Sequence, residues 1–93
     1  MIKLESNICH VTDNFLFHVH GKLFQTQEKF QKAWNHFTIA IEVDPKSYLA
    51  YEGRAVVCLQ MGNYFAALQD INTAIKVLIH LDSIIIDINQ YYR

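Results

Sequence analysis

Apolar and small residues recur along this chain at intervals of three and four, the spacing of one face of an α-helix. One such stripe consists of Phe30, Ala33, Trp34, Phe37, Ala40 and Ile41. A second consists of Tyr64, Ala67, Leu68, Ile71, Ala74, Ile75 and Leu78. A shorter stripe precedes each of them, made of Phe17, Gly21 and Phe24 or of Tyr51, Ala55 and Cys58. The pattern predicts an all-α fold with helices near residues 14–26, 29–43, 47–60 and 64–79.

The later pair of stripes repeats the earlier pair at one constant offset, the shift that takes Ala33 to Ala67. At this repeat offset, residues of similar size coincide, such as Phe37 with Ile71, whereas charged residues do not repeat. A single helix pair cannot bury its apolar stripe alone, so neighbouring pairs stack and need the same sizes at the same positions. We interpret the repeat as a packing constraint in an α-solenoid of two helix–turn–helix units, residues 14–47 and 48–81.

The residues between the predicted helices are typical of helix ends. Pro45 in "DPKS" cannot continue a helix, and Ser47 can accept hydrogen bonds from the first N–H groups of the next one. Gly62 in "MGN" tolerates the left-handed conformation in which helices often end. These residues place the boundaries between the four helices.

Two segments lie outside the two units. Thr12 or Asp13 can cap the first helix, which would leave residues 1–13 as a lead-in. At the other end, residues 82–93 form a tail rich in isoleucine. Asp82 and Ser83 could begin a further helix near 83–92 that caps the second unit or represents a truncated third unit. The alternative is that β-branched residues resist a helix and leave an adhesive tail.

Composition narrows the class of protein. The chain has 93 residues, an apolar content of 52% and a net charge of −1, so a folded domain is expected. Its eight Lys and Arg are scattered, which argues against a nucleic-acid surface. Residues 77–88 are the most apolar stretch, but His80 and Asp82 interrupt it, and a membrane span needs about 20 apolar residues. Two cysteines are too few for a disulfide framework, and we expect a cytoplasmic protein.

Candidate catalytic or metal-binding residues are few. The cluster with metal-ligating side chains consists of Cys9, His10, His18 and His20. Two residues apart on a helix, His18 and His20 point about 200° apart and cannot bind one ion together. Cys58 falls on a packing stripe, where a thiol is usually inert, and Arg54 at an inward position is expected to form an ion pair within the chain. We therefore expect no enzyme activity, no metal and no cofactor.

Residue spacing within the two units resembles that of the tetratricopeptide repeat family, whose helix–turn–helix unit has a period of about 34 residues. The first copy reads Phe17-x2-His20-Gly21-x2-Phe24, then Ala33-x3-Phe37, Ala40 and Pro45. The second reads Tyr51-x2-Arg54-Ala55-x2-Cys58, then Gly62, Tyr64, Ala67, Ile71 and Ala74. Departures from the family pattern occur at His20, Arg54, Cys58 and Ile79. The resemblance covers residues 14–78 and is most specific over 33–77.

This resemblance implies a non-catalytic scaffold that binds proteins. In the family, the first helices of successive units line a concave groove that holds a peptide or a helix of a partner protein. The groove positions of this chain are Phe15, His18, Lys22, Gln25 and Thr26 in the first unit and Leu49, Glu52, Val56, Leu59 and Gln60 in the second. The alternative is a structural piece of a longer superhelix, or a self-associating one, in which a neighbouring repeat covers the apolar members of this set.

One known binding mode of the family does not fit. Some members clamp the C-terminal carboxylate of chaperones with Lys and Asn side chains in the groove. Here His18, Lys22 and Gly53 stand at those positions, and Asp87 stands where a cation is needed, so it would repel a carboxylate. We expect a partner protein or peptide that is bound in another way.

Overall fold

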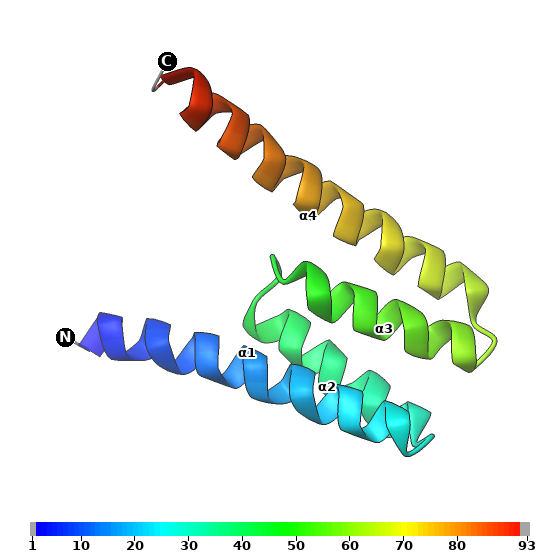
Figure 1. The fold of residues 1–93 in the computed structure, drawn as a ribbon. Helices are drawn as coiled ribbons and strands as arrows, with labels where there is room; N and C mark the ends of the chain where they lie inside the picture. Colours follow the sequence, from blue (N-terminus) through cyan, green and yellow to red (C-terminus); the bar gives the residue numbers. More distant parts are fainter. Residues whose placement is uncertain (1, 92–93) are drawn as a thin grey trace.

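The computed structural model describes the backbone of residues 2–91 and the side chains of residues 13–80. The chain forms four helices, namely α1 (Ile2–Thr26), α2 (Phe30–Val43), α3 (Tyr48–Gln60) and α4 (Tyr64–Tyr91). Each helix packs against the next one along the chain, and α1 also contacts α3 (Figure 1). The pairs α1–α2 and α3–α4 are the two helical hairpins that the repeat predicts, so the all-α fold is confirmed.

The first helix is longer than predicted. It begins at Ile2 rather than near residue 14, so the segment expected to precede the first helix is itself helical over its described part. Asp13 lies inside the helix and does not cap it. The physical reason is that residues 1–20 contain neither Gly nor Pro, and a capping residue type alone does not interrupt a helix.

The last helix is also longer than predicted. It runs without interruption from Tyr64 to Tyr91, so the helix expected near 83–92 is the continuation of α4. Residues 63–93 again contain neither Gly nor Pro. Whether the isoleucines of this tail pack on the second unit lies outside the described side chains. In Figure 1 the ends of α1 and α4 extend beyond the part of the molecule in which the four helices are packed.

The turns within the two units have the same hydrogen bonds. The N–H of Lys29 donates to the carbonyl of Phe24 at 2.9 Å, and the N–H of Asn63 donates to the carbonyl of Cys58 at 2.8 Å. These six-to-one bonds define the Schellman ending of a helix. The residue before each donor has a positive φ, 60° at Glu28 and 82° at Gly62, which confirms the left-handed turn expected at Gly62.

The turn between the units lacks the expected cap. Ser47 is the N-cap residue of α3, but its side chain makes no capping hydrogen bond. The carboxylate of Asp44 instead accepts a hydrogen bond from the N–H of Lys46 at 3.0 Å, which holds the turn at Pro45. The boundary was therefore predicted correctly, whereas the capping hydrogen bond was not.

One aromatic ring occupies the centre of the core. Phe37 is fully buried and packs with Ala33 and Val57. A Cβ atom added to Gly53 would come within 2.4 Å of its ring, and one added to Gly21 would come within 2.8 Å. The ring therefore lies against the bare backbone of both α1 and α3, which explains why α1 and α3 can both contact α2 closely.

A second cluster joins the two units. Ala55, Cys58 and Ala67 are buried together between α3 and α4, and Trp34 of α2 packs against both this cluster and the one around Phe37. Gly21 and Ala55, the small members of the stripes of α1 and α3, are both buried. The packing stripes of α1, α2 and α3 are thus confirmed.

The stripe of α4 differs from the prediction. Ala67 and Ala74 are buried with Asp70, but the bulky members of the stripe, Tyr64, Leu68, Ile71, Ile75 and Leu78, are all exposed. The small residues face α3. The large residues lie on the adjacent flank of α4, where no helix among the described residues covers them. The repeat pattern predicts which residues can pack, whereas burial also requires a partner helix.

None of the helices, over the residues described, combines the length and apolarity needed to cross a membrane.

Candidate functional site

The ten predicted groove positions lie on α1 and α3, the first helices of the two units, which contact each other. We call this surface the α1–α3 face; it consists of Phe15, His18, Lys22, Gln25, Thr26, Leu49, Glu52, Val56, Leu59 and Gln60. None of these residues is fully buried, so each has atoms that solvent can reach.

The middle of the α1–α3 face is polar. His18 on α1 is half-buried, and the charges of Lys22 and Glu52 act on its imidazole. Burial lowers the pKa of the His18 imidazole, the charge of Lys22 lowers it further, and the charge of Glu52 partly opposes them. The ring meets Phe37 edge-on, with 5.7 Å between centroids. The two charged side chains thus have opposite effects on the pKa of this imidazole.

One end of the face is tied together by amides. The Nε2 of Gln25 donates to the Oε1 of Gln60 at 3.1 Å, which links the last turn of α1 to the last turn of α3. Thr26 does not join this link, because its hydroxyl donates to the carbonyl of Leu23 in its own helix at 2.7 Å. The exposed amide groups of the glutamine pair have remaining donors and acceptors that a bound peptide backbone could use.

The α1–α3 face also carries four apolar side chains. Phe15 is 65% exposed, Leu49 is 46% exposed and Leu59 is 44% exposed, whereas Val56 is half-buried. Phe15 and Leu49 occupy equivalent positions in the two units, since the repeat offset takes one to the other. The α1–α3 face thus combines exposed apolar groups with a pair of opposite charges.

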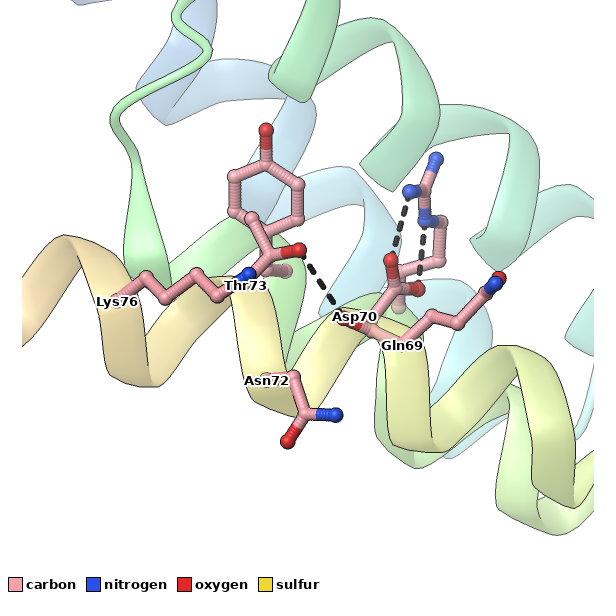
Figure 2. Close-up of a pocket in the computed structure, with 7 residues that line it drawn as sticks. Gln69, Asp70, Asn72, Thr73 and Lys76 are labelled. Carbon is pink, nitrogen blue, oxygen red and sulfur yellow. Dashed lines mark hydrogen bonds and ion pairs between the residues drawn. The ribbon is translucent and has the colours of Figure 1, made fainter.

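A separate polar pocket lies between α3 and α4 (Figure 2). It is lined by Tyr51, Arg54, Gln69, Asp70, Asn72, Thr73 and Lys76. Two hydrogen bonds of 2.8 Å join the Nε and NH2 atoms of Arg54 to the two carboxylate oxygens of Asp70. The hydroxyl of Thr73 donates to the carbonyl of Gln69 at 3.0 Å. The side chains of Arg54, Asp70 and Thr73 are therefore already engaged within the protein.

Arg54 has a structural role in this pocket. Its NH1 also donates to the hydroxyl of Thr38 at 3.2 Å, so one guanidinium connects α2, α3 and α4. The hydrogen bond to Asp70 raises the pKa of Arg54 above its ordinary value. The group also stacks at 5.7 Å from the centroid of Trp34. The ion pair expected at Arg54 is confirmed. Asp70 compensates the positive charge of Arg54, which a ligand in the pocket would otherwise contact.

Asp70 was not singled out from the sequence, although a signal was present. It lies three residues after Ala67 and four before Ala74, on the stripe of small residues that packs on α3. A carboxylate buried there without a partner would be strongly destabilising. Its position therefore indicates a cation on the facing helix.

The structure also places the candidate reactive residues. Cys58 is fully buried, and burial raises the pKa of its thiol. His20 meets His36 edge-on, with 5.7 Å between ring centroids. Among residues 13–80, no three His, Cys, Asp or Glu side chains are grouped as metal ligands. Cys9 and His10 lie outside the described side chains.

Two known proteins match the chain over 57 residues, which are 61% of its length. Tetratricopeptide repeat protein 6 of Homo sapiens is 77% identical over this stretch, and DnaJ homolog subfamily C member 3 of Gallus gallus is 37% identical. The resemblance to tetratricopeptide repeat proteins is confirmed. No protein-family model and no solved structure matches the chain.

The chain spans about 11% of the length of each of these relatives. The sequence match and the fold support the same assignment of repeat type. The two hairpins α1–α2 and α3–α4 are tetratricopeptide-like units, a type of repeat that generally serves protein interaction.

Proposed function

We propose that the chain is a non-catalytic interaction module that binds an extended peptide or a helix of a partner protein on the α1–α3 face. The observation that supports this most directly is the exposure of Phe15, Leu49 and Leu59 on the two leading helices. In the same helices, the apolar residues that serve packing, such as Val57 and Cys58, are fully buried. The exposed set has no role in the core of the two units.

The face defines the chemistry of the partner. Apolar side chains of the ligand would contact Phe15 and Leu59, and the opposite charges of Lys22 and Glu52 would orient it. Because the His18 imidazole has a lowered pKa, it is neutral at pH 7 and adds no charge to the site. The amphipathic partner would therefore carry at least one acidic and one basic residue between apolar anchors.

The chaperone carboxylate clamp is not the proposed mode. Gly53, at one of the clamp positions, is buried under the ring of Phe37 and does not face a ligand. His18, at another clamp position, is neutral rather than cationic. We place the binding in the cytoplasm, where the buried, free thiol of Cys58 would stay reduced.

The experiment is a peptide selection on the immobilised chain, followed by affinity measurements on the selected peptides. Phe15→Ser and Leu59→Ser should each weaken binding about tenfold or more, as expected for an apolar anchor. Both residues are exposed, so the melting temperature should change little. Phe65→Ser is the matched control, because Phe65 is 72% exposed on α4, away from the α1–α3 face.

A charge variant tests the polar middle. Exchanging the charges, Lys22→Glu with Glu52→Lys, should reverse the preference for peptides of opposite charge order while leaving the fold intact. If the control at Phe65 weakens binding as much as Phe15→Ser and Leu59→Ser do, the ligand binds elsewhere. If neither the serine variants nor the charge exchange alters binding, the α1–α3 face is not the site.

A further inference from the structure

Two apolar surfaces at opposite ends of the helix stack remain exposed. On α1, Leu16, Val19 and Leu23 are 47%, 42% and 51% exposed. We call these three residues the α1 end face. On α4, Leu68, Ile71 and Ile75 are 56%, 38% and 47% exposed. We call these the α4 end face. Neither set belongs to the α1–α3 face.

The same repeat positions are covered inside the chain. Shifted forward by the repeat offset, the α1 end face corresponds to Ala50, Gly53 and Val57 of α3, and all three are buried. Shifted back by the same offset, the α4 end face corresponds to Trp34, Phe37 and Ile41 of α2, of which Phe37 is fully buried and the other two are half-buried. These six residues lie on the two helices that meet between the units, α2 and α3.

The two exposed faces are therefore the two halves of an interface that the chain already makes once. We propose that a second copy of this chain occupies the α4 end face, so that α1 of one copy packs on α4 of another as α3 packs on α2. The residues of the two end faces carry no formal charge, so no like-charge repulsion opposes the contact.

The sizes of the residues are compensated across the proposed contact. Inside the chain, Gly53 leaves room for the large ring of Phe37. At the equivalent positions, Val19, which is larger than glycine, would meet Ile71, which is smaller than phenylalanine. A polar pair is also matched, because Arg54 donates to Thr38 between α3 and α2, and His20 and Asn72 stand at the corresponding positions. The residues at the proposed contact between α1 and α4 can therefore fill the space, or form the hydrogen bond, that the equivalent residues provide between α3 and α2.

The lengths of the helices fit this arrangement. After α2 the chain turns at Asp44–Ser47, and α3 returns antiparallel to it, whereas α4 continues through the equivalent residues 78–81 without a turn. No described helix thus folds back over the α4 end face. In an antiparallel contact with residues 71 and 19 opposite each other, residue 2 of α1 reaches residue 88 of α4, so the two long helices overlap over their lengths.

The contact is head-to-tail and uses a different surface on each copy. It does not close on itself, so assembly continues as the concentration rises. Sedimentation velocity over a series of concentrations should therefore show wild-type species larger than a dimer. Leu23→Glu and Leu68→Glu should each abolish this association, because a carboxylate would be buried in the contact. Phe65→Glu should associate like the wild type, since the equivalent residue, Gln31, is exposed.

Mixing the two variants decides the orientation. The Leu23→Glu chain keeps an intact α4 end face, and the Leu68→Glu chain keeps an intact α1 end face. An equimolar mixture should form a dimer with one copy of each, and this dimer should not grow further. Circular dichroism should show equal helicity in all variants, because the altered residues are exposed. This outcome would not depend on any ligand of the α1–α3 face.

Other outcomes overturn the proposal. A wild-type chain that stays monomeric at every concentration shows that the end faces do not bind each other. If Leu23→Glu still dimerises and the mixture gains nothing, two α4 end faces pair symmetrically instead. If Phe65→Glu is as defective as the other variants, the association is non-specific.

Discussion

Glu28 and Gly62 occupy the same position in the two units, and both have a positive φ, 60° and 82°. The surrounding hydrogen bonds are also equivalent, from Glu28 N–H to the carbonyl of Gln25 at 3.0 Å and from Gly62 N–H to the carbonyl of Leu59 at 3.0 Å. Glycine adopts this conformation readily, whereas a residue with a Cβ atom is strained in it. The first unit thus carries a local strain that the second avoids.

Glu28→Gly should stabilise the protein. Removing the Cβ atom relieves the strained φ, and the greater freedom of glycine in the unfolded chain offsets part of the gain. We expect the free energy of unfolding to rise by about 0.5–1 kcal/mol. Urea denaturation would measure this change, provided that the slope of the unfolding free energy against urea concentration is the same in the two proteins.

Gly62→Ala is the matched control for this prediction. Nothing lies within 4 Å of the added Cβ atom, so the substitution alters only the backbone preference. It should lower the free energy of unfolding by about 1 kcal/mol. If both substitutions shift the urea midpoint in the same direction, the strain at Glu28 is not the cause.

Gly53→Ala should destabilise the fold. Alanine is favoured over glycine in a helix by about 1 kcal/mol, but its Cβ atom would come within 2.4 Å of the Phe37 ring. The ring cannot retreat, because Gly21 lies against it as well. We expect a net loss of about 1–3 kcal/mol. Adding Phe37→Leu should recover part of that loss. A Gly53→Ala variant that is more stable than the wild type would contradict the close packing of Gly53 against the Phe37 ring.

Asp70→Ala should expose the importance of the ion pair with Arg54. The Arg54 side chain is 19% exposed and that of Asp70 is 9% exposed, so solvent replaces the lost hydrogen bonds only in part. The free energy of unfolding should fall by about 2 kcal/mol, the range for hydrogen bonds to charged groups. A double-mutant cycle with Arg54→Met should show coupling, and strictly additive effects would argue against the pair.

Acidification should weaken the fold through His18. The folded-state pKa of His18 is lower than its ordinary value of 6.5, so unfolding takes up a proton as the pH falls. The stabilisation is complete above pH 6.5 and is lost as the pH falls through the folded-state pKa. His18→Gln should therefore show a shallower loss of stability between pH 6.5 and the folded-state pKa of His18 in denaturant titrations. Identical pH profiles for the two proteins would rule out this contribution.

The helical pattern predicts the fold well because each stripe is set by local spacing. Apolar residues at three- and four-residue intervals identify all four helices, and Pro45 and Gly62 mark two of the three turns. The outer ends of α1 and α4 were missed for one reason. Thr12, Asp13 and Asp82 are residue types that can begin a helix, but nothing in the sequence forces one to end there.

Packing between helices is less accessible from the sequence. Gly53 falls on a position of the family's carboxylate clamp, whereas the structure places it against Phe37. The exposure of Ile71 could not be predicted either, because the repeat pattern specifies an apolar residue without saying whether a helix covers it. The groove residues stay a prediction, since their contacts with a partner are what would define them.

The position of Phe37 has a consequence for ligand selection. Its ring is the common support of α1 and α3, the two helices that carry the α1–α3 face. The angle between those helices, and with it the separation of Phe15 from Leu59, depends on the thickness of one aromatic ring. A change at this core position would therefore tune which ligand shapes fit without altering a single side chain on the binding surface.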